Sequence, residues 1–302
     1  MGLLVVGSVA LDSVKTPFGE AQEVLGGSAT YFSISASYFT EVSLVAVVGE
    51  DFPNAHIELL KKRGIQLDGL EKQKGKTFRW VGEYGYQLNE AKTLETHLNV
   101  FEKFNPQIPK AYQTANLVFL ANIDPDLQRG VLHQVKSPQL VACDTMNFWI
   151  DGKPDSLKKT LGEVSILIIN DGEARALAQN PNLVQAAQTI LSYGPKILIV
   201  KRGEYGALMF NGESIFSAPG FPLEQVYDPT GAGDSFAGGF MGYLANTQNY
   251  SESNMRQAVI FGSVMASFCV EAFSLERLNS LNYQEIVNRY REFKRLTHFE
   301  EV

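Results

Sequence analysis

Residues 228–240 read Asp-Pro-Thr-Gly-Ala-Gly-Asp-Ser-Phe-Ala-Gly-Gly-Phe, a turn that runs directly into a helical pattern. The opening Asp-Pro-Thr suits the turn, because proline fixes φ and short polar side chains bond to the nearby backbone. Gly231 and Gly233 carry no side chain, so an anion can approach their N–H groups closely. Apolar residues then recur at helical spacing, namely Phe236, Ala237, Phe240, Met241 and Leu244. The stretch predicts a helix whose free N–H groups and positive dipole end favour a phosphate.

Asp234 places a carboxylate in the first turn of this predicted helix, beside the expected anion site. Anion binding alone explains a negative group there poorly. A general base that takes a proton from a hydroxyl attacking phosphorus explains it better. The alternative is a helix-capping acid beside two turn-forming glycines, since short glycine patterns recur by chance.

Short apolar runs alternate with helical stretches along most of the chain. The candidate buried strands are residues 3–7, 42–48, 117–120, 140–142, 166–169 and 197–200, and the later helices are expected near 126–136, 154–162, 172–192 and 232–246. This order predicts an α/β fold with a mostly parallel central sheet and helices on both faces. The carboxyl ends of parallel strands meet at one edge of a sheet. We therefore expect one rim to carry the polar residues that follow four of these runs, Asn122, Asp144, Asn170 and Lys201.

Residues 76–101 have a different character, because polar, aromatic and β-branched residues are mixed around a turn near 88–90. This pattern predicts one or two exposed antiparallel hairpins. Strands with exposed edges need a cover, which is either a bound ligand or a partner chain.

The bulk composition excludes several classes of protein. The 302 residues carry a net charge of −7 and no Lys/Arg-rich run, which argues against nucleic acid as a partner. No apolar run approaches the roughly 18 residues that span a bilayer, so no membrane partner is expected. The start of the chain lacks the basic region of a signal peptide, and Cys143 and Cys269 lie far apart without metal-type spacing. These features indicate a reduced, cytoplasmic protein.

The string at 228–240 resembles the second signature of the ribokinase-like (PfkB) carbohydrate kinases. The resemblance implies an ATP-dependent kinase that phosphorylates a hydroxymethyl group of a sugar, built as a single domain over residues 1–302. In this family a small β-sheet closes over the sugar as a lid and sometimes pairs two subunits. Lid strands are therefore expected at about 13–24 and 76–101, and a homodimer through the lid is one assembly that this allows. Asp234 then acts as the general base, and Gly231, Ala232 and Gly233 form the anion hole.

Asn170-Asp171-Gly172-Glu173 matches the family's Asn-x-x-Glu pattern. The resemblance implies that Asn170 and Glu173 position Mg²⁺ and the phosphates of ATP largely through water, as suits a cation that gives up its waters reluctantly. The same residues also fit an ordinary capping box, with asparagine before the helix and glutamate three residues later.

Other positions match parts of the family that surround the nucleotide. The run at 201–206 resembles a glycine-containing turn, and the resemblance places Lys201, Gly203, Gly206 and Gly262 at ATP. Gly262 also fits a tight contact between helices. Asp228 and Thr230 match positions that hold a monovalent cation in some relatives, so K⁺ is a further candidate ligand.

The acceptor side is expected near the start of the chain. The carboxylate of Asp12 can accept hydrogen bonds from two hydroxyl groups, and the backbone at Gly26 and Gly27 lets a sugar lie close to the chain. Asn122 is a further candidate from its position at a strand end.

This acceptor side departs from the ribokinase pattern. Ala10 and Tyr31 stand where the family usually has asparagines. Two amide donors are lost and an aromatic ring is gained, which makes a ring-bearing acceptor such as a nucleoside more plausible than ribose, because aromatic rings stack.

Three functions remain open from the sequence. The first is a sugar kinase, the second is a nucleoside kinase of the adenosine type, and the third is a sugar- or nucleotide-binding protein that keeps the fold without catalysis. Transfer from ATP to a panel of sugars and nucleosides separates the first two, and loss of turnover on changing Asp234 excludes the third.

Overall fold

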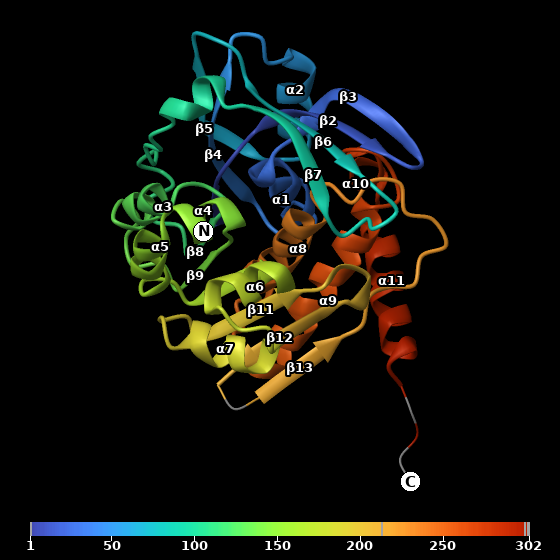
Figure 1. The fold of residues 1–302 in the computed structure, drawn as a ribbon. Helices are drawn as coiled ribbons and strands as arrows, with labels where there is room; N and C mark the ends of the chain where they lie inside the picture. The colour runs from blue at the N-terminus through green and yellow to red at the C-terminus, as the bar shows by residue number, and fades with distance from the viewer. Residues whose placement is uncertain (1, 213, 299, 301–302) are drawn as a thin grey trace.

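The computed structural model describes residues 2–212, 214–298 and 300 (Figure 1). Within these residues the larger sheet has nine strands in the order β13-β12-β11-β10-β9-β8-β1-β4-β5. All neighbouring strands from β11 to β5 are parallel, and only β12 and β13 run antiparallel to their neighbours. The strand bounds are β1 Leu3–Val6, β4 Val42–Gly49, β5 Gln66–Gln73, β8 Leu117–Leu120, β9 Leu140–Cys143, β10 Ile166–Asn170, β11 Ile197–Lys201, β12 Ala207–Asn211 and β13 Ser214–Ala218. The predicted mostly parallel α/β sheet is confirmed.

Helices cover both faces of this sheet, because its central strands are apolar at every position. In β1, Leu3 and Val5 face one layer of the core, while Leu4 and Val6 face the other. The first layer is completed by α1 Ser28–Ala36, α2 Asn54–Lys62, α8 Ala232–Thr247, α9 Glu252–Cys269, α10 Glu276–Ser280 and α11 Tyr283–Leu296. The second layer contains α3 Pro125–Leu132, α4 Asn147–Gly152, α5 Pro154–Leu161, α6 Asp171–Ala178 and α7 Leu183–Leu191, with a short 3₁₀ helix at Asn99–Lys103.

A separate sheet of four strands lies at one end of the molecule, in the order β3-β2-β6-β7 (Figure 1). Its strands are β2 Ala10–Thr16, β3 Gly19–Gly26, β6 Phe78–Tyr84 and β7 Ala91–His97. β2 pairs antiparallel with β3, β6 pairs antiparallel with β7, and β2 joins the two hairpins by running parallel to β6. All seven residues of β7 are exposed, so the outer edge of this sheet faces solvent.

One predicted helix is wrong. The sequence pattern indicates a single helix over 172–192, whereas the structure has two, α6 and α7. Gln179 ends α6 in the left-handed region with φ 50°, and Pro181 follows. Proline cannot supply the next intrahelical N–H, and the Asn182 side chain caps a fresh start by accepting from the N–H groups of Val184 and Gln185.

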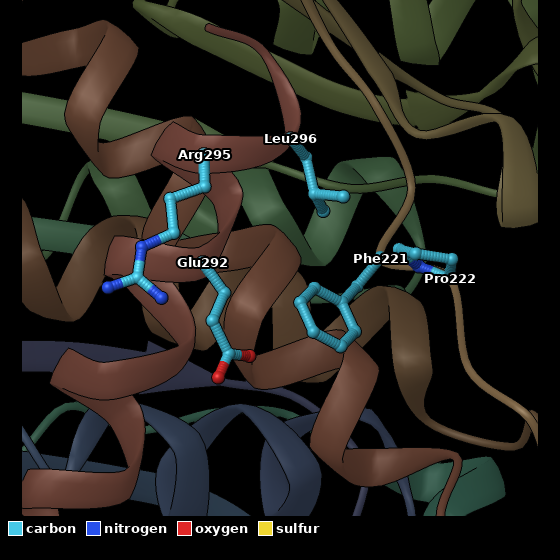
Figure 2. A pocket seen from close by; sticks show the side chains of 5 residues that line it. All are labelled: Phe221, Pro222, Glu292, Arg295 and Leu296. Carbon is cyan, nitrogen blue, oxygen red and sulfur yellow. The ribbon is translucent and has the colours of Figure 1, made fainter.

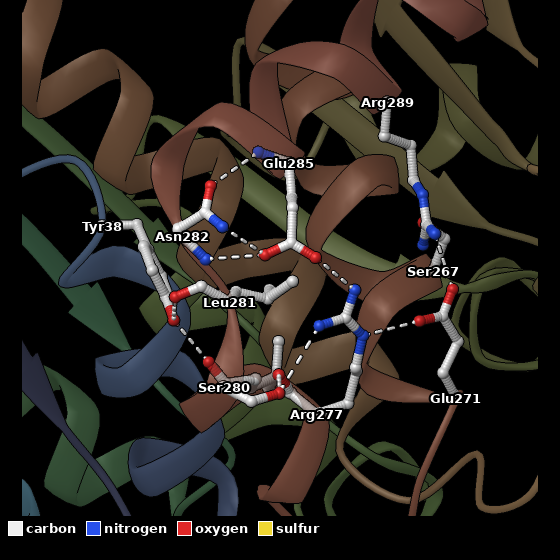
Figure 3. A network of polar contacts seen from close by, with 10 residues as sticks. Tyr38, Ser267, Glu271, Arg277, Ser280, Leu281, Asn282, Glu285 and Arg289 are labelled. Atoms are coloured by element: carbon white, nitrogen blue, oxygen red, sulfur yellow. Dashed lines mark hydrogen bonds and ion pairs between the residues drawn. The ribbon is translucent and has the colours of Figure 1, made fainter.

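The C-terminal helices are joined by a network of ion pairs (Figure 3). Arg277 bonds Glu271 at 2.9 Å and Glu285 at 2.8 Å, and Arg289 bonds Glu271 at 2.6 Å. Asn282 and Glu285 form a capping box at the start of α11. The network connects the end of α9 with α10 and α11, and none of its ion-paired residues belongs to the 228–240 stretch.

Helix α8 is held by backbone-to-backbone contact on two sides (Figure 1). A Cβ atom at Gly238 would overlap the carbonyl oxygen of Phe32 in α1, and one at Gly239 would lie 2.8 Å from the carbonyl oxygen of Phe261 in α9. Since no side chain fits at either position, α1 and α9 fix the axis of α8, and with it the direction in which the start of α8 points.

Gly238→Ala is expected to destabilise the fold by about 1–3 kcal/mol, because the added methyl group forces α1 and α8 apart. The free energy of unfolding from urea titration measures this. Gly130→Ala in α3 is the matched control, since nothing lies within 4 Å of a Cβ there. Alanine favours a helix over glycine by up to about 1 kcal/mol, so the control should be neutral or stabilising. Equal effects of the two substitutions would contradict the packing argument.

Candidate active site

The carboxyl ends of β8, β9, β10 and β11 lie side by side at one edge of the large sheet. Asn122, Asp144, Asn170 and Lys201 stand at or just beyond these ends, as the sequence pattern predicts. Asn122 Oδ1 accepts from Trp149 Nε1 at 3.1 Å, and Lys201 Nζ lies 3.2 Å from Asp144 Oδ2. The rim therefore carries polar side chains at the ends of four neighbouring strands.

The loop before α8 follows the expected turn-to-helix course. Gly231 is its N-cap residue, in the left-handed region with φ 74°. Asp228 fastens the loop, because its carboxylate accepts from the N–H of Thr230 at 2.9 Å and from the N–H of Ser274 at 3.1 Å. Helix geometry leaves the N–H groups of Gly233 and of the residue after it without a carbonyl partner inside α8. They form a site for negative oxygens.

Tyr31 of α1 packs against the loop at Gly231. A Cβ atom at Gly231 would overlap the Tyr31 ring, and the ring is only 1% exposed. Its faces are therefore covered by the protein. Tyr31 therefore has no free ring face for the stacking role that the sequence suggested. Its ring packs against Gly231 instead.

Asp234 lies half-buried in the first turn of α8. Burial raises the pKa of its carboxyl to about 7, the charge of Asp144 adds to the rise, and the charge of Lys201 opposes it. A carboxylate with this pKa is protonated and deprotonated near neutral pH, which suits a general base.

Lys201 and Asp144 form an ion pair against the same loop. The two side chains are 16% and 8% exposed, and a Cβ atom at Gly233 would lie 2.8 Å from Lys201 Nζ. Sequence reasoning placed Lys201 at the nucleotide but gave Asp144 no role beyond the rim. Its partner lies 57 residues away, and no local pattern reveals the pair.

Asn170 and Glu173 form the capping box that the sequence allowed. The Asn170 Oδ1 atom accepts from the N–H of Glu173 at 2.7 Å, and Glu173 Oε2 accepts from the N–H of Asn170 at 2.8 Å. Burial raises the pKa of Glu173 to about 7, and the charge of Asp144 contributes. One carboxylate oxygen of Glu173 thus serves the cap and the other remains for a ligand.

No cluster of three or more His, Cys, Asp or Glu side chains that could hold a metal ion occurs in the described part of the chain. The donor set at Asn170 and Glu173 nevertheless fits Mg²⁺, which prefers oxygen ligands and keeps several waters. Such an ion would take most of its ligands from water and from phosphate oxygens.

The glycines predicted at the nucleotide have different surroundings. Gly203, with φ 54°, lies in a short 3₁₀ turn after β11 and contacts Asn89 of the β6–β7 turn, and Gly206, with φ 86°, packs on the backbone around Pro219. Gly262 faces α8, where a Cβ atom would lie 2.8 Å from the carbonyl oxygen of Phe236. The structure thus gives Gly262 the tight helix contact that the sequence left as its alternative role.

The predicted acceptor residues Asp12, Gly26 and Gly27 come together beyond the end of β1. Asp12 Oδ2 accepts from the N–H of Gly27 at 3.2 Å, and a side chain at Gly26 would overlap the Asp12 carboxylate. Asp12 is 5% exposed, and burial raises its pKa to about 7, with contributions from the charges of Asp228 and Asp234.

Tyr84 of β6 is a site residue that sequence reasoning missed. Its hydroxyl lies 3.3 Å from Thr230 Oγ1, and burial raises the pKa of its phenol. The second sheet therefore reaches the loop at 228–234 directly. The only sequence signal was an aromatic residue at the end of the 78–84 strand pattern.

A hollow elsewhere on the surface has no part in this arrangement. Figure 2 shows it beside α11, lined by Phe221, Pro222, Glu292, Arg295 and Leu296. None of the predicted site residues lines it.

In the described ranges, no helix is both long and apolar enough to cross a bilayer.

Comparison with known proteins identifies the family of the chain. The family model described as pfkB family carbohydrate kinase matches residues 6–279. A cytidine kinase of Thermococcus kodakarensis is 28% identical over 247 residues, which cover 80% of this chain and 87% of that protein.

Two solved structures are similar in fold. The nucleoside kinase of Methanocaldococcus jannaschii, a member of the ribokinase family, superposes with a TM-score of 0.77 at 20% identity, covering 97% of this chain and 99% of that one. A protein from Escherichia coli solved with ATP and Mg²⁺ gives a TM-score of 0.78 at 16% identity, covering 96% and 99%. The chain belongs to the pfkB family of carbohydrate kinases and is a phosphotransferase that acts on an alcohol group.

Proposed function

We propose that this kinase transfers the γ-phosphoryl group of Mg-ATP to a hydroxymethyl group of a sugar or sugar-bearing small molecule. The observation that carries the proposal is the position of Asp234, in the first turn of α8, beside the glycine loop at 231–233 and an ion-paired lysine. Bound Mg-ATP would supply the phosphoryl group and neutralise part of its negative charge.

Asp234 is the general base in this proposal. It takes the proton from the acceptor hydroxyl as the hydroxyl oxygen attacks phosphorus. The backbone N–H groups of Gly231 and Gly233 stabilise the negative oxygens of the phosphoryl group, because preorganised donors need no rearrangement when charge develops. Ala232 lies between them in the proposed anion hole, and its own N–H already donates to the carbonyl oxygen of Pro229 at 3.2 Å.

Asn170 and Glu173 order the Mg²⁺ ion, mainly through water. The capping box supports this role, since it fixes the Glu173 carboxylate at the end of β10 and leaves one oxygen free. Lys201, Gly203 and Gly206 are assigned to the nucleotide because they continue the same rim beyond β11.

The monovalent cation at Asp228 and Thr230 stays a prediction. Asp228 is 1% exposed and already accepts from two backbone N–H groups, so its first role is to hold the loop. The comparison of kinase activity in K⁺ and in tetramethylammonium shows whether Asp228 and Thr230 also hold a monovalent cation.

The second sheet is assigned as a cover for the acceptor. Tyr84 supports this, because it brings β6 to Thr230 while β2 of the same sheet carries Asp12. The exposed edge at β7 is the surface through which two copies would pair in a homodimer.

A nucleoside is the second candidate for the acceptor, and one observation favours it. The Phe148 ring is 66% exposed and meets Trp149 edge-on, with ring centroids 4.8 Å apart. Trp149 in turn donates to Asn122, which follows β8, the neighbour of β1 in the sheet. An exposed ring at this end of the sheet offers a face on which a base can stack.

Phe148→Ala is expected to raise KM for nucleosides about two- to tenfold while leaving KM for free pentoses unchanged, since stacking contributes about 0.5–1.5 kcal/mol. Phosphoryl transfer from ATP is measured across pentoses, hexoses and nucleosides for both proteins. Equal changes for sugars and nucleosides would contradict the stacking role. Tyr283→Ala is the control, since Tyr283 is also exposed, at 47%, and lies at the start of α11, away from the residues assigned to the nucleotide and the acceptor.

Asp234→Asn is expected to lower kcat at least ~10²-fold while ATP binding persists, because the variant keeps the shape of the side chain and loses the base. Turnover and nucleotide binding are measured on the same preparation. Unchanged turnover would remove the assigned role of Asp234 and favour the non-catalytic alternative for this residue.

The pH dependence of kcat/KM follows from the raised pKa of Asp234. A general base must be deprotonated, so activity should be full above about pH 7 and fall about tenfold per pH unit below it. The residual rate of Asp234→Asn should lack this limb. An activity that is flat down to about pH 5, as for an ordinary aspartate, would contradict the assignment.

A further inference from the structure

The Asp144–Lys201 pair crosses the end of a strand that lies between its two members. Asp144 follows β9 and Lys201 ends β11, while β10 runs between them. Neighbouring strands lie about 4.8 Å apart, so the two backbones are roughly 10 Å apart and only a long side chain can close the gap. The lysine stem bridges it, and its Nζ stops 3.2 Å from Asp144 Oδ2.

Both charges are largely removed from solvent. The side chains are 16% and 8% exposed, and the second oxygen of Asp144 accepts from the N–H of Thr145 at 2.7 Å. An ammonium group alone at such a depth would be strongly unfavourable, and a carboxylate within bonding distance offsets this. Asp144 therefore helps to keep Lys201 charged at this position, together with the charges of Glu173 and Asp234.

The ammonium lies against the loop at the start of α8. A Cβ atom at Gly233 would lie 2.8 Å from Lys201 Nζ, which places the charge beside the free backbone N–H groups. Lys201 also interacts with the charges of Glu173 and Asp234. The ammonium group of Lys201 therefore interacts with the carboxylates of Asp144, Glu173 and Asp234, beside the loop at which phosphate oxygens would bind.

We propose that Asp144 is a positioning residue, which holds the Lys201 ammonium beside Gly233 so that it stabilises the β- and γ-phosphate oxygens of the nucleotide during transfer. This inference rests on the proposed function, since it requires the phosphates to lie at the loop. Asp144 itself touches no reacting atom. It acts by fixing where a mobile, four-carbon side chain keeps its charge.

A pair that served only packing would act differently. Replacing both members by neutral side chains of similar size commonly preserves or improves stability, because the cost of desolvating two charges disappears. Such a replacement would leave catalysis unchanged if the pair were structural. If the pair positions charge for the phosphates, the neutral protein folds and yet binds them poorly.

The test compares four proteins: the parent, Lys201→Met, Asp144→Asn and the double variant. Calorimetric titration with ATP and with AMP gives nucleotide affinity, turnover with the best acceptor gives kcat, and thermal unfolding gives Tm. AMP lacks the β- and γ-phosphates, so the ratio of ATP to AMP affinity reports the charge beside the loop.

Lys201→Met should weaken ATP binding on the order of tenfold, the value of one charge-assisted hydrogen bond, and leave AMP binding within about twofold. Asp144→Asn should keep ATP binding within about threefold and lower kcat about tenfold, because the ammonium is present but no longer fixed. The double variant should regain a Tm near that of the parent while its ATP affinity and kcat stay as low as in Lys201→Met.

A matched control replaces an ion pair outside the site, Arg277→Met with Glu285→Gln, from the network of Figure 3. It should leave the ATP-to-AMP ratio and kcat at parental values.

A folded double variant with parental ATP binding and parental kcat would overturn the inference, as would equal weakening of ATP and AMP in Lys201→Met. Parental kcat in Asp144→Asn would overturn it as well, because the ammonium would then act without being held by the carboxylate. If a single variant fails to fold, the double variant still distinguishes a purely structural pair, with parental ATP binding and kcat, from a pair that serves the phosphates. If the parent transfers phosphate to no acceptor, the proposed function fails, but the ATP-to-AMP ratio still reports the pair.

Discussion

Close contact between the backbones of α1 and α8 determines where Asp234 and the glycine loop lie. Gly238 meets the Phe32 carbonyl, and at the start of the same helix Gly231 rests on the Tyr31 ring. One face of α1 thus sets both the axis of α8 and the height of its first turn above the strand ends. The first turn of α8, with Asp234, keeps its position because no side chain at Gly238 or Gly231 separates α8 from α1.

The electrostatics of the site follow from this placement. Asp144, Glu173 and Asp234 converge on the end of β10, and burial raises the pKa of each. One buried ammonium, from Lys201, partly offsets their repulsion. The arrangement keeps Asp234 basic near neutral pH while a positive charge remains beside the loop. The charges of Asp228 and Asp234 also contribute to the raised pKa of Asp12.

The sequence was most informative where function depends on contiguous residues. The loop at 228–234, the apolar strand runs and the Asn170–Glu173 cap are local patterns, and the structure has each of them. It was least informative for contacts between distant segments. Neither the Asp144–Lys201 pair nor the approach of Tyr84 to Thr230 leaves a local pattern, and the aromatic character of Tyr31 suggested stacking although neighbouring helices bury its ring. The break at Gln179 was missed although the sequence marks it, since a polar run that contains Pro181 stands where α6 ends.

The parallel pairing of β2 with β6 has a consequence for how the molecule is assembled. Ala10 pairs with Phe78, and the intervening chain supplies α1, β4, α2 and β5 of the main body. A parallel pair has no tight turn to nucleate it, and closing so long a segment loses chain entropy before any contact forms. The small sheet is therefore expected to join after the edge of the large sheet has folded. Until it does, the strand that carries Asp12 lacks its neighbour β6, so the acceptor side proposed above would be among the last parts of the molecule to form.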